Sequence, residues 1–151
     1  MEANEYYMEL AIQQAETAYS IGEVPVGGLI IYNNQIIATA YNKKEINNNS
    51  LDHAEIILIG EASKKIDRWR LTDCIMYITL EPCPMCAGAI IQSRISKLVF
   101  GANNKKYGSF GSVINLENYY PDAKNLTIEK GVLQDKISIM MKKFFRNKLK
   151  T

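Results

Sequence analysis

Two short stretches carry the residue types that can hold a metal ion. His53 and Glu55 stand together in Asp52-His53-Ala54-Glu55, and Cys83 and Cys86 follow in a C-x-x-C spacing within Leu80-Glu81-Pro82-Cys83-Pro84-Met85-Cys86. One imidazole, two thiolates and a nearby carboxylate are what a catalytic zinc with an open fourth position requires. The two stretches together therefore predict metal chemistry.

Both stretches are expected at the N-termini of helices. Pro84 suits the first turn of a helix, and Asp52 precedes an apolar run as an N-capping residue would. The positive ends of two helices would then face one ion and help to hold Cys83 and Cys86 as thiolates. In a first turn, His53 and Glu55 can flank an ion that lies beyond the end of the helix.

Two other interpretations of the cysteines remain open. A C-x-x-C pair also occurs in redox-active dithiols, which need neither His53 nor Glu55. A structural zinc needs a fourth protein ligand, and because His53 is the only histidine, Cys74 or a carboxylate would have to supply it. The pairing of H-x-E with P-C-x-x-C is the signature of zinc deaminases and favours the catalytic site.

The bulk properties predict one cytoplasmic domain over residues 1–151. The chain has 151 residues, three cysteines and no apolar run long enough to span a bilayer. Too few cysteines are present for a disulfide framework. The charge is uneven: residues 1–134 hold 12 basic and 15 acidic side chains, a net −3, whereas residues 135–151 hold 6 and 1, a net +5.

Periodicity and turn residues predict helices alternating with strands. We expect helices at Glu5 to Ser20, His53 to about Lys64, Met85 to Ser93 and Asp135 to Lys150, the last being basic. We expect strands at Val24 to Tyr32, Gln35 to Tyr41, Cys74 to Leu80, Lys97 to Gly101 and, as an edge strand, Leu126 to Glu129. Asn33-Asn34 should form a hairpin turn between the first two strands. This alternation indicates an α/β/α layered domain, with the metal motif at the C-terminal end of a strand.

The chain resembles the bacterial tRNA-specific adenosine deaminases of the cytidine deaminase-like superfamily. H-A-E with P-C-x-x-C specifies only the superfamily, while the longer L-E-P-C-P-M-C-A-G-A and a terminal F-F-R point to the tRNA branch. Further matching segments are Glu23-Val24-Pro25-Val26-Gly27, Asn42, Arg70-Leu71, Ser93-Arg94-Ile95, Phe100-Gly101-Ala102, Gly108 and Gly131-Val132-Leu133. The chain departs from the family at Ser50-Leu51-Asp52, at Asn104 and around Lys124-Asn125.

This resemblance implies a three-layer fold around a five-stranded mixed sheet, a homodimer, and conversion of adenosine to inosine at the wobble position of a tRNA anticodon loop. It implies one Zn²⁺ per chain held by His53, Cys83 and Cys86, with Glu55 as the proton shuttle. Asn42 and Val26 would form part of the base pocket. The remaining candidate substrate-binding residues are Asn104 and Lys106, in a segment placed beside the substrate backbone, and Phe144, Phe145 and Arg146 in the closing helix.

Two other functions remain possible at this point. A deaminase of free nucleobases or nucleosides would keep the zinc chemistry but would need no basic tail. A zinc-stabilised RNA-binding module without catalysis would leave Glu55 with no role. The basic tail favours RNA, because lysines and arginines attract phosphates and aromatic rings can stack on an unpaired base.

Overall fold

The computed structural model describes residues 2–149, so the predicted end of the last helix at Lys150, and Thr151, lie outside the described residues. The helices are α1 (Ala3–Ser20), α2 (Ala54–Ile66), α3 (Pro84–Gln92) and α4 (Gln134–Leu149). The strands are β1 (Gly27–Tyr32), β2 (Gln35–Tyr41), β3 (Ile75–Leu80), β4 (Lys97–Ala102) and β5 (Thr127–Lys130). Two 3₁₀ helices, η1 (Leu116–Asn118) and η2 (Pro121–Asn125), lie between β4 and β5. Within residues 2–149, no helix is both long and apolar enough to cross a membrane.

The five strands form one mixed sheet in the order β2-β1-β3-β4-β5. β1 is antiparallel to both β2 and β3, whereas β3, β4 and β5 run parallel to one another. A parallel pair needs a crossover connection, and α3 supplies it between β3 and β4. The five-stranded mixed sheet predicted from the resemblance is confirmed, with β5 at an edge as expected.

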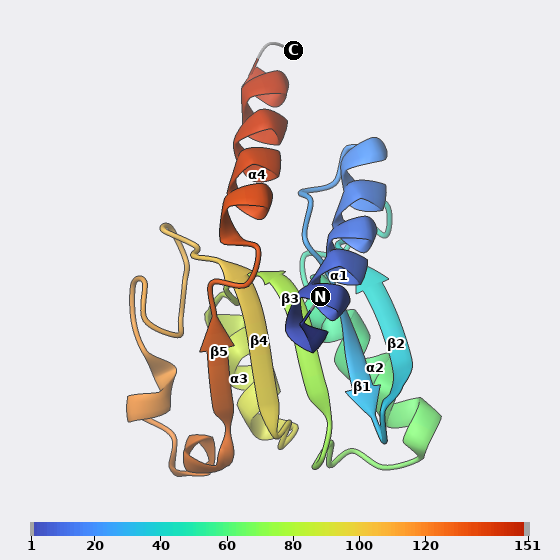
Figure 1. Ribbon diagram of the computed structural model, residues 1–151, viewed down its shortest axis with the longest axis vertical. Coiled ribbons are helices and arrows are strands. Elements are labelled where there is room, and N and C mark those ends of the chain that lie inside the picture. The colour runs from blue at the N-terminus through green and yellow to red at the C-terminus, as the bar shows by residue number, and fades with distance from the viewer. Residues whose placement is uncertain (1, 150–151) are drawn as a thin grey trace.

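Helices cover both faces of the sheet (Figure 1). α2 and α3 pack on one face, where Leu58 and Ile90 join the buried sheet residues Ile78 and Phe100. α1 covers the other face, and the start of α4 adds Ile137 to that second apolar cluster. Burial of these two clusters is the main driving force for the fold, and the α/β/α layering is confirmed.

The first hairpin has the predicted turn but a later start. Asn33 and Asn34 have φ values of 51° and 61°, which is the left-handed region that a two-residue hairpin turn requires. β1 begins at Gly27, not at Val24, because the preceding Pro25 has no N–H to donate to a strand ladder. At Gly27, α1 comes so close that an added Cβ would lie 2.4 Å from the backbone nitrogen of Ala15. This close approach fixes α1 against the sheet.

α4 extends beyond the sheet at the end where β3 and β4 finish (Figure 1). It follows β5 through Gly131 and Leu133, whose φ values are 88° and 54°. Tyr19 of α1 holds its far half: the Tyr19 ring lies 5.4 Å from the ring of Phe144, and the Tyr19 hydroxyl accepts a 3.0 Å hydrogen bond from Asn147. α4 therefore stands beside α1, beyond the carboxyl ends of β3 and β4 (Figure 1).

Candidate active site

Two helix N-termini deliver the predicted metal ligands to one place. His53 is the N-cap residue of α2, and Glu55 lies in the first turn of that helix. Cys83 is the N-cap residue of α3, which begins at Pro84, and Cys86 lies in its first turn. Both motifs are thus at helix N-termini, as predicted, and both helix dipoles favour negative charge at this point.

The side chain that caps α2 is a different one from the predicted Asp52. The Oδ1 atom of Asn42 accepts a 2.8 Å hydrogen bond from the backbone N–H of Ala54. The carboxylate of Asp52 instead accepts hydrogen bonds from the amides of Asn47, at 2.8 Å, and Asn49, at 3.3 Å. The prediction that Asp52 is the N-cap was wrong because the cap comes from a residue twelve positions upstream that the fold brings to the end of the helix.

The three donor atoms have the spacing that a tetrahedral zinc needs. The Nδ1 atom of His53 lies 3.7 Å from the Sγ atom of Cys83 and 3.5 Å from that of Cys86, and all three donors lie within 4.8 Å of one another. Zinc bonds of about 2.0–2.1 Å to nitrogen and 2.3 Å to sulfur, at tetrahedral angles, separate N and S by about 3.6 Å. His53, Cys83 and Cys86 therefore fit one zinc ion through Nδ1 and two sulfurs.

The electrostatics of the site favour a shared negative charge on the sulfurs. The hydrogen bond from Cys86 lowers the pKa of Cys83 to about 4, and the same contact together with burial raises the pKa of Cys86. The hydrogen bond with Cys83 raises the pKa of His53. Burial raises the pKa of the Glu55 carboxyl to about 7. A coordinated metal ion deprotonates its thiol ligands and would hold both sulfurs as thiolates.

A cleft of about 410 Å³ opens above these residues. Its walls come from the segment after α1, from the loops that follow β2 and β4, from the end of β3, and from α4. The lining residues are Gly22, Glu23, Val24, Val26, Asn42, Lys44, Glu45, His53, Glu55, Leu80, Glu81, Cys83, Asn104, Lys106, Tyr107, Met141, Phe145 and Lys148. The volume is in the range of small-ligand sites, so the cleft can hold one base beside Glu55.

Most of the predicted substrate-binding residues lie in this cleft. They are Val26, Asn42, Asn104, Lys106 and Phe145. The structure places Phe144 elsewhere, buried against Tyr19 with 6% of its surface exposed, and it places Arg146 on the exposed surface of α4 outside the cleft. Successive residues of a helix point about 100° apart, so three consecutive positions cannot all face one cleft.

Further residues line the cleft although they were not predicted, and helical spacing from Phe145 indicates two of them. Met141 and Lys148 lie four residues before and three residues after Phe145, so they share its face of α4 and line the cleft with it. Tyr107 follows the predicted Lys106 directly and also lines the cleft. Glu23 and Glu81 also line the cleft, and each is only 1% exposed. Nothing in the sequence beside them indicates that these two carboxylates are buried.

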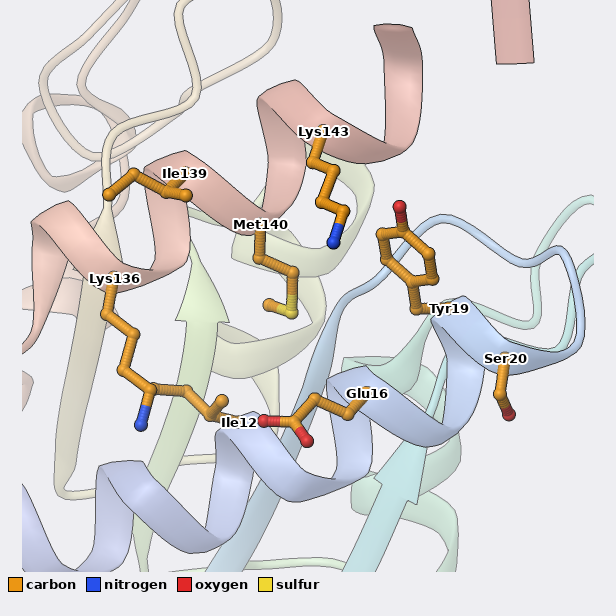
Figure 2. A pocket seen from close by; sticks show the side chains of 8 residues that line it. All are labelled: Ile12, Glu16, Tyr19, Ser20, Lys136, Ile139, Met140 and Lys143. Carbon is orange, nitrogen blue, oxygen red and sulfur yellow. The ribbon is translucent and has the colours of Figure 1, made fainter. Parts of the chain in front are cut away.

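A second hollow lies on the other side of α4, between it and α1 (Figure 2). It measures about 320 Å³ and is lined by Ile12, Glu16, Tyr19 and Ser20 of α1 and by Lys136, Ile139, Met140 and Lys143 of α4. None of the predicted metal or substrate residues lines it. α4 thus separates this hollow from the cleft, and only the cleft contains the candidate metal ligands.

The class of the protein follows from the fold and from a family comparison. A model of the MafB19-like deaminases matches residues 2–149. A mixed α/β sheet with a His/Cys/Cys group beside a buried glutamate at two helix N-termini is the arrangement of the cytidine deaminase-like enzymes. The chain is a deaminase of this class, so the superfamily resemblance is confirmed.

Individual relatives define the family more narrowly. The chain is 42% identical to the tRNA-specific adenosine deaminase of Bacillus subtilis, over 97% of this chain and 91% of that protein. A solved tRNA:A34 deaminase aligns with a TM-score of 0.82 and 31% identity, covering 89% of this chain and 98% of that one. A guanine deaminase from Bacillus subtilis aligns with a TM-score of 0.64 and 33% identity, covering 68% and 66%. The chain belongs to the family of tRNA-specific adenosine deaminases.

Proposed function

We propose that this protein hydrolyses adenosine to inosine at the wobble position of a tRNA anticodon loop. The observation that carries the proposal is the His53, Cys83 and Cys86 group beside buried Glu55 in the cleft, in a chain that belongs to the tRNA-specific adenosine deaminases. The reaction consumes one water, which supplies the oxygen of inosine, and releases the amine as ammonia.

One Zn²⁺ per chain is the cofactor that these donors fit, with His53, Cys83 and Cys86 as its ligands. When bound, zinc supplies Lewis-acid activation of a water by lowering the pKa of that water toward 7. Among residues 2–149 this donor group has three members and no fourth, so a zinc ion held by them would keep one position for the reacting water.

Glu55 is the group that moves protons. Its carboxyl is 4% exposed and lines the cleft two residues after the His53 ligand, so it can reach both the reacting water and the base without serving as a ligand. It takes a proton from the water and delivers it to the ring nitrogen, and it then takes the second proton from the added hydroxyl and gives it to the leaving amine. Asn42 and Val26 form the wall against which the base is oriented.

The rim of the cleft suits a single-stranded RNA loop. A base paired in a duplex cannot reach the buried Glu55, so the substrate must present it unpaired and splayed out. Lys44, Lys106 and Lys148 line the cleft and can contact phosphates, and Tyr107 and Phe145 offer rings for stacking. Asn104 orders the Lys106 and Tyr107 backbone, and the exposed Arg146 can reach phosphates beyond the cleft.

We further propose that the protein works in the cytoplasm as a homodimer. Exposed apolar side chains gather in the segment between β4 and η2, which a second copy can cover. They are Val113, Ile114, Tyr119 and Tyr120. A run of this kind on a monomer surface is typical of a protein interface.

A deaminase of free bases is the second candidate, because the solved guanine deaminase is 33% identical over 68% of this chain. An incubation experiment distinguishes the two functions. Purified protein is incubated with a tRNA transcript carrying A34, with the same transcript carrying G34, and with free adenine, guanine and cytosine. Inosine measured by mass spectrometry and released ammonia should appear with the A34 transcript alone. Ammonia from a free base, with no inosine in the transcript, would instead support the second candidate.

A metal measurement tests the ligand assignment in the same preparation. Purified wild-type protein should carry one zinc per chain, and Cys86→Ala should lose both zinc and activity. Cys74→Ala is the matched control, because Cys74 is equally buried but lies outside the donor group, so its zinc content should not change. Full zinc content in Cys86→Ala would contradict the assignment.

A further inference from the structure

Glu81 lies at the end of β3 with its carboxylate almost fully buried beside the cleft, at 1% exposure. It forms no ion pair with a described residue, since the ion pairs found in residues 2–149 involve Asp122, Glu129 and Glu9. A buried carboxylate without a cation is costly unless hydrogen-bond donors surround it. The donors to the Glu81 carboxylate therefore show which part of the chain this side chain holds in place.

All of the donors to Glu81 come from one segment after β4. Its Oε1 atom accepts from the backbone N–H of Asn104 at 3.1 Å, and its Oε2 atom accepts from those of Phe110 at 3.0 Å and Ser112 at 3.1 Å. The Ser112 hydroxyl also donates to Oε1. One side chain therefore ties both ends of the segment 104–112 to the end of β3.

The segment closes tightly around this carboxylate. A Cβ at Gly108 would lie 2.5 Å from both Cδ and Oε1 of Glu81 and 2.5 Å from the carbonyl oxygen of Asn104. The backbone N–H of Ser109 donates to the carbonyl of Pro82 at 3.0 Å, which joins the same segment to the residue before Cys83. The position of segment 104–112 is thus coupled to the start of α3.

Segment 104–112 carries one wall of the cleft. Asn104, Lys106 and Tyr107 line it. The Oδ1 atom of Asn104 accepts the backbone N–H groups of Lys106 at 3.2 Å and Tyr107 at 3.0 Å, so the turn that presents these two side chains begins at the residue whose own N–H is bound by Glu81. A continuous set of hydrogen bonds joins Glu81 to the rim.

We propose that Glu81 is a positioning residue for substrate binding, which holds Lys106 and Tyr107 where they meet the RNA backbone and an unpaired base. The inference rests on the proposed function, because it assigns the wall to that substrate. Glu81 does not touch the reacting atoms. Its removal should therefore weaken substrate binding and leave the chemical step of bound substrate intact.

Glu81→Gln tests this directly. The amide replaces one acceptor oxygen with a donor that faces backbone N–H groups, so part of the wall must move. With zinc content unchanged, we expect KM for an A34 anticodon stem-loop to rise about tenfold and kcat to stay within about twofold. Glu61→Gln, a change of the same kind on the exposed side of α2, is the matched control and should leave both constants unchanged.

Amide hydrogen exchange gives a second readout that does not need activity. In Glu81→Gln, exchange should accelerate at Asn104, Phe110 and Ser112, while amides within β3 and β4 keep their protection. Ser112→Ala removes the hydroxyl donor alone and should shift KM in the same direction by a smaller factor. If Glu81→Gln fails to fold, the effect of Ser112→Ala on KM and exchange decides the question.

Three results would overturn the inference. They are an unchanged KM in a folded variant, unchanged exchange in segment 104–112, and a loss of kcat together with zinc, which would mean that Glu81 acts through Cys83 and the metal. Absence of inosine formation by the wild-type protein would refute the proposed function instead. The exchange measurement would still report whether Glu81 fixes the wall.

Discussion

The Oδ1 atom of Asn42 accepts a hydrogen bond from the backbone N–H of Ala54 at 2.8 Å, so a side chain that lines the cleft also caps the helix that carries His53 and Glu55. The backbone N–H of Asn42 in turn donates to the carbonyl of Val26 at 3.0 Å. The amide of Asn42 has one oxygen and one NH₂ group, and the oxygen is already used by the helix. The NH₂ group is what remains to contact a base.

Two substitutions at Asn42 separate these roles. Asn42→Asp keeps an oxygen for Ala54 and should leave the free energy of unfolding almost unchanged, because Asp caps helices as well as Asn. It removes the NH₂ donor and adds a negative charge, so kcat/KM should fall at least about tenfold. Asn42→Ala should lose about 1 kcal/mol of stability as well as activity. Chemical denaturation and inosine formation measure the two effects, and an active Asn42→Asp would contradict the role in base binding.

Phe144 and Phe145 are adjacent but have different environments. Phe144 is 6% exposed against Tyr19, whereas Phe145 is 46% exposed and lines the cleft. Phe144→Ala should lower the free energy of unfolding by about 3 kcal/mol. Phe145→Ala should lower it by less than about 1 kcal/mol but raise KM for the anticodon stem-loop at least about fivefold, as expected for loss of a stacked base. The reverse pattern, with Phe145→Ala the less stable variant, would show that the assignment of the two rings is wrong.

The basic side chains of α4 should contribute to RNA affinity through phosphate contacts. Lys142, Lys143, Arg146 and Lys148 are all exposed. Their joint replacement by Gln should weaken tRNA binding and flatten its salt dependence, since each phosphate contact contributes about −0.7 to −0.9 to the slope of log K against log salt. Binding titrations at several salt concentrations measure this slope.

A paired control separates phosphate contacts from net charge. Lys64→Gln with Lys65→Gln removes two charges from the last turn of α2, at the opposite end of the helix from His53 and Glu55, and should leave the slope almost unchanged. If the slope of log K against log salt is the same for the wild type and the α4 variant while both still bind tRNA, the proposed role of α4 in phosphate binding is contradicted.

The sequence predicted the parts of the site that depend on local spacing. The placement of Cys83 and Cys86 was predictable because Pro84 starts a helix between them, and that of His53 was predictable because it also stands at a helix start. The turn at Asn33-Asn34 was predictable for the same reason, since both residues tolerate positive φ. These features need only a few neighbouring residues.

Contacts between distant segments were not predictable in this way. The cap on Ala54 comes from Asn42 and not from the neighbouring Asp52, and nothing near Glu81 in the chain shows that it binds residues 104–112. The orientation of α4 depends on Tyr19, which is more than a hundred residues away and places Phe144 inside and Phe145 in the cleft. Tertiary packing determines these contacts and the orientation of α4, and the residue pattern within a single helix does not reveal them.

The central claim is that Glu55 moves protons at a zinc site formed by His53, Cys83 and Cys86. Glu55→Gln tests it most directly, because the amide has nearly the same shape as the carboxyl but cannot shuttle a proton. Zinc content by metal analysis and inosine in an A34 transcript by mass spectrometry should be measured on the same purified sample. We predict that the variant keeps its zinc and its fold while kcat falls at least about 100-fold. A zinc-loaded Glu55→Gln protein that forms inosine at close to the wild-type rate would contradict the account.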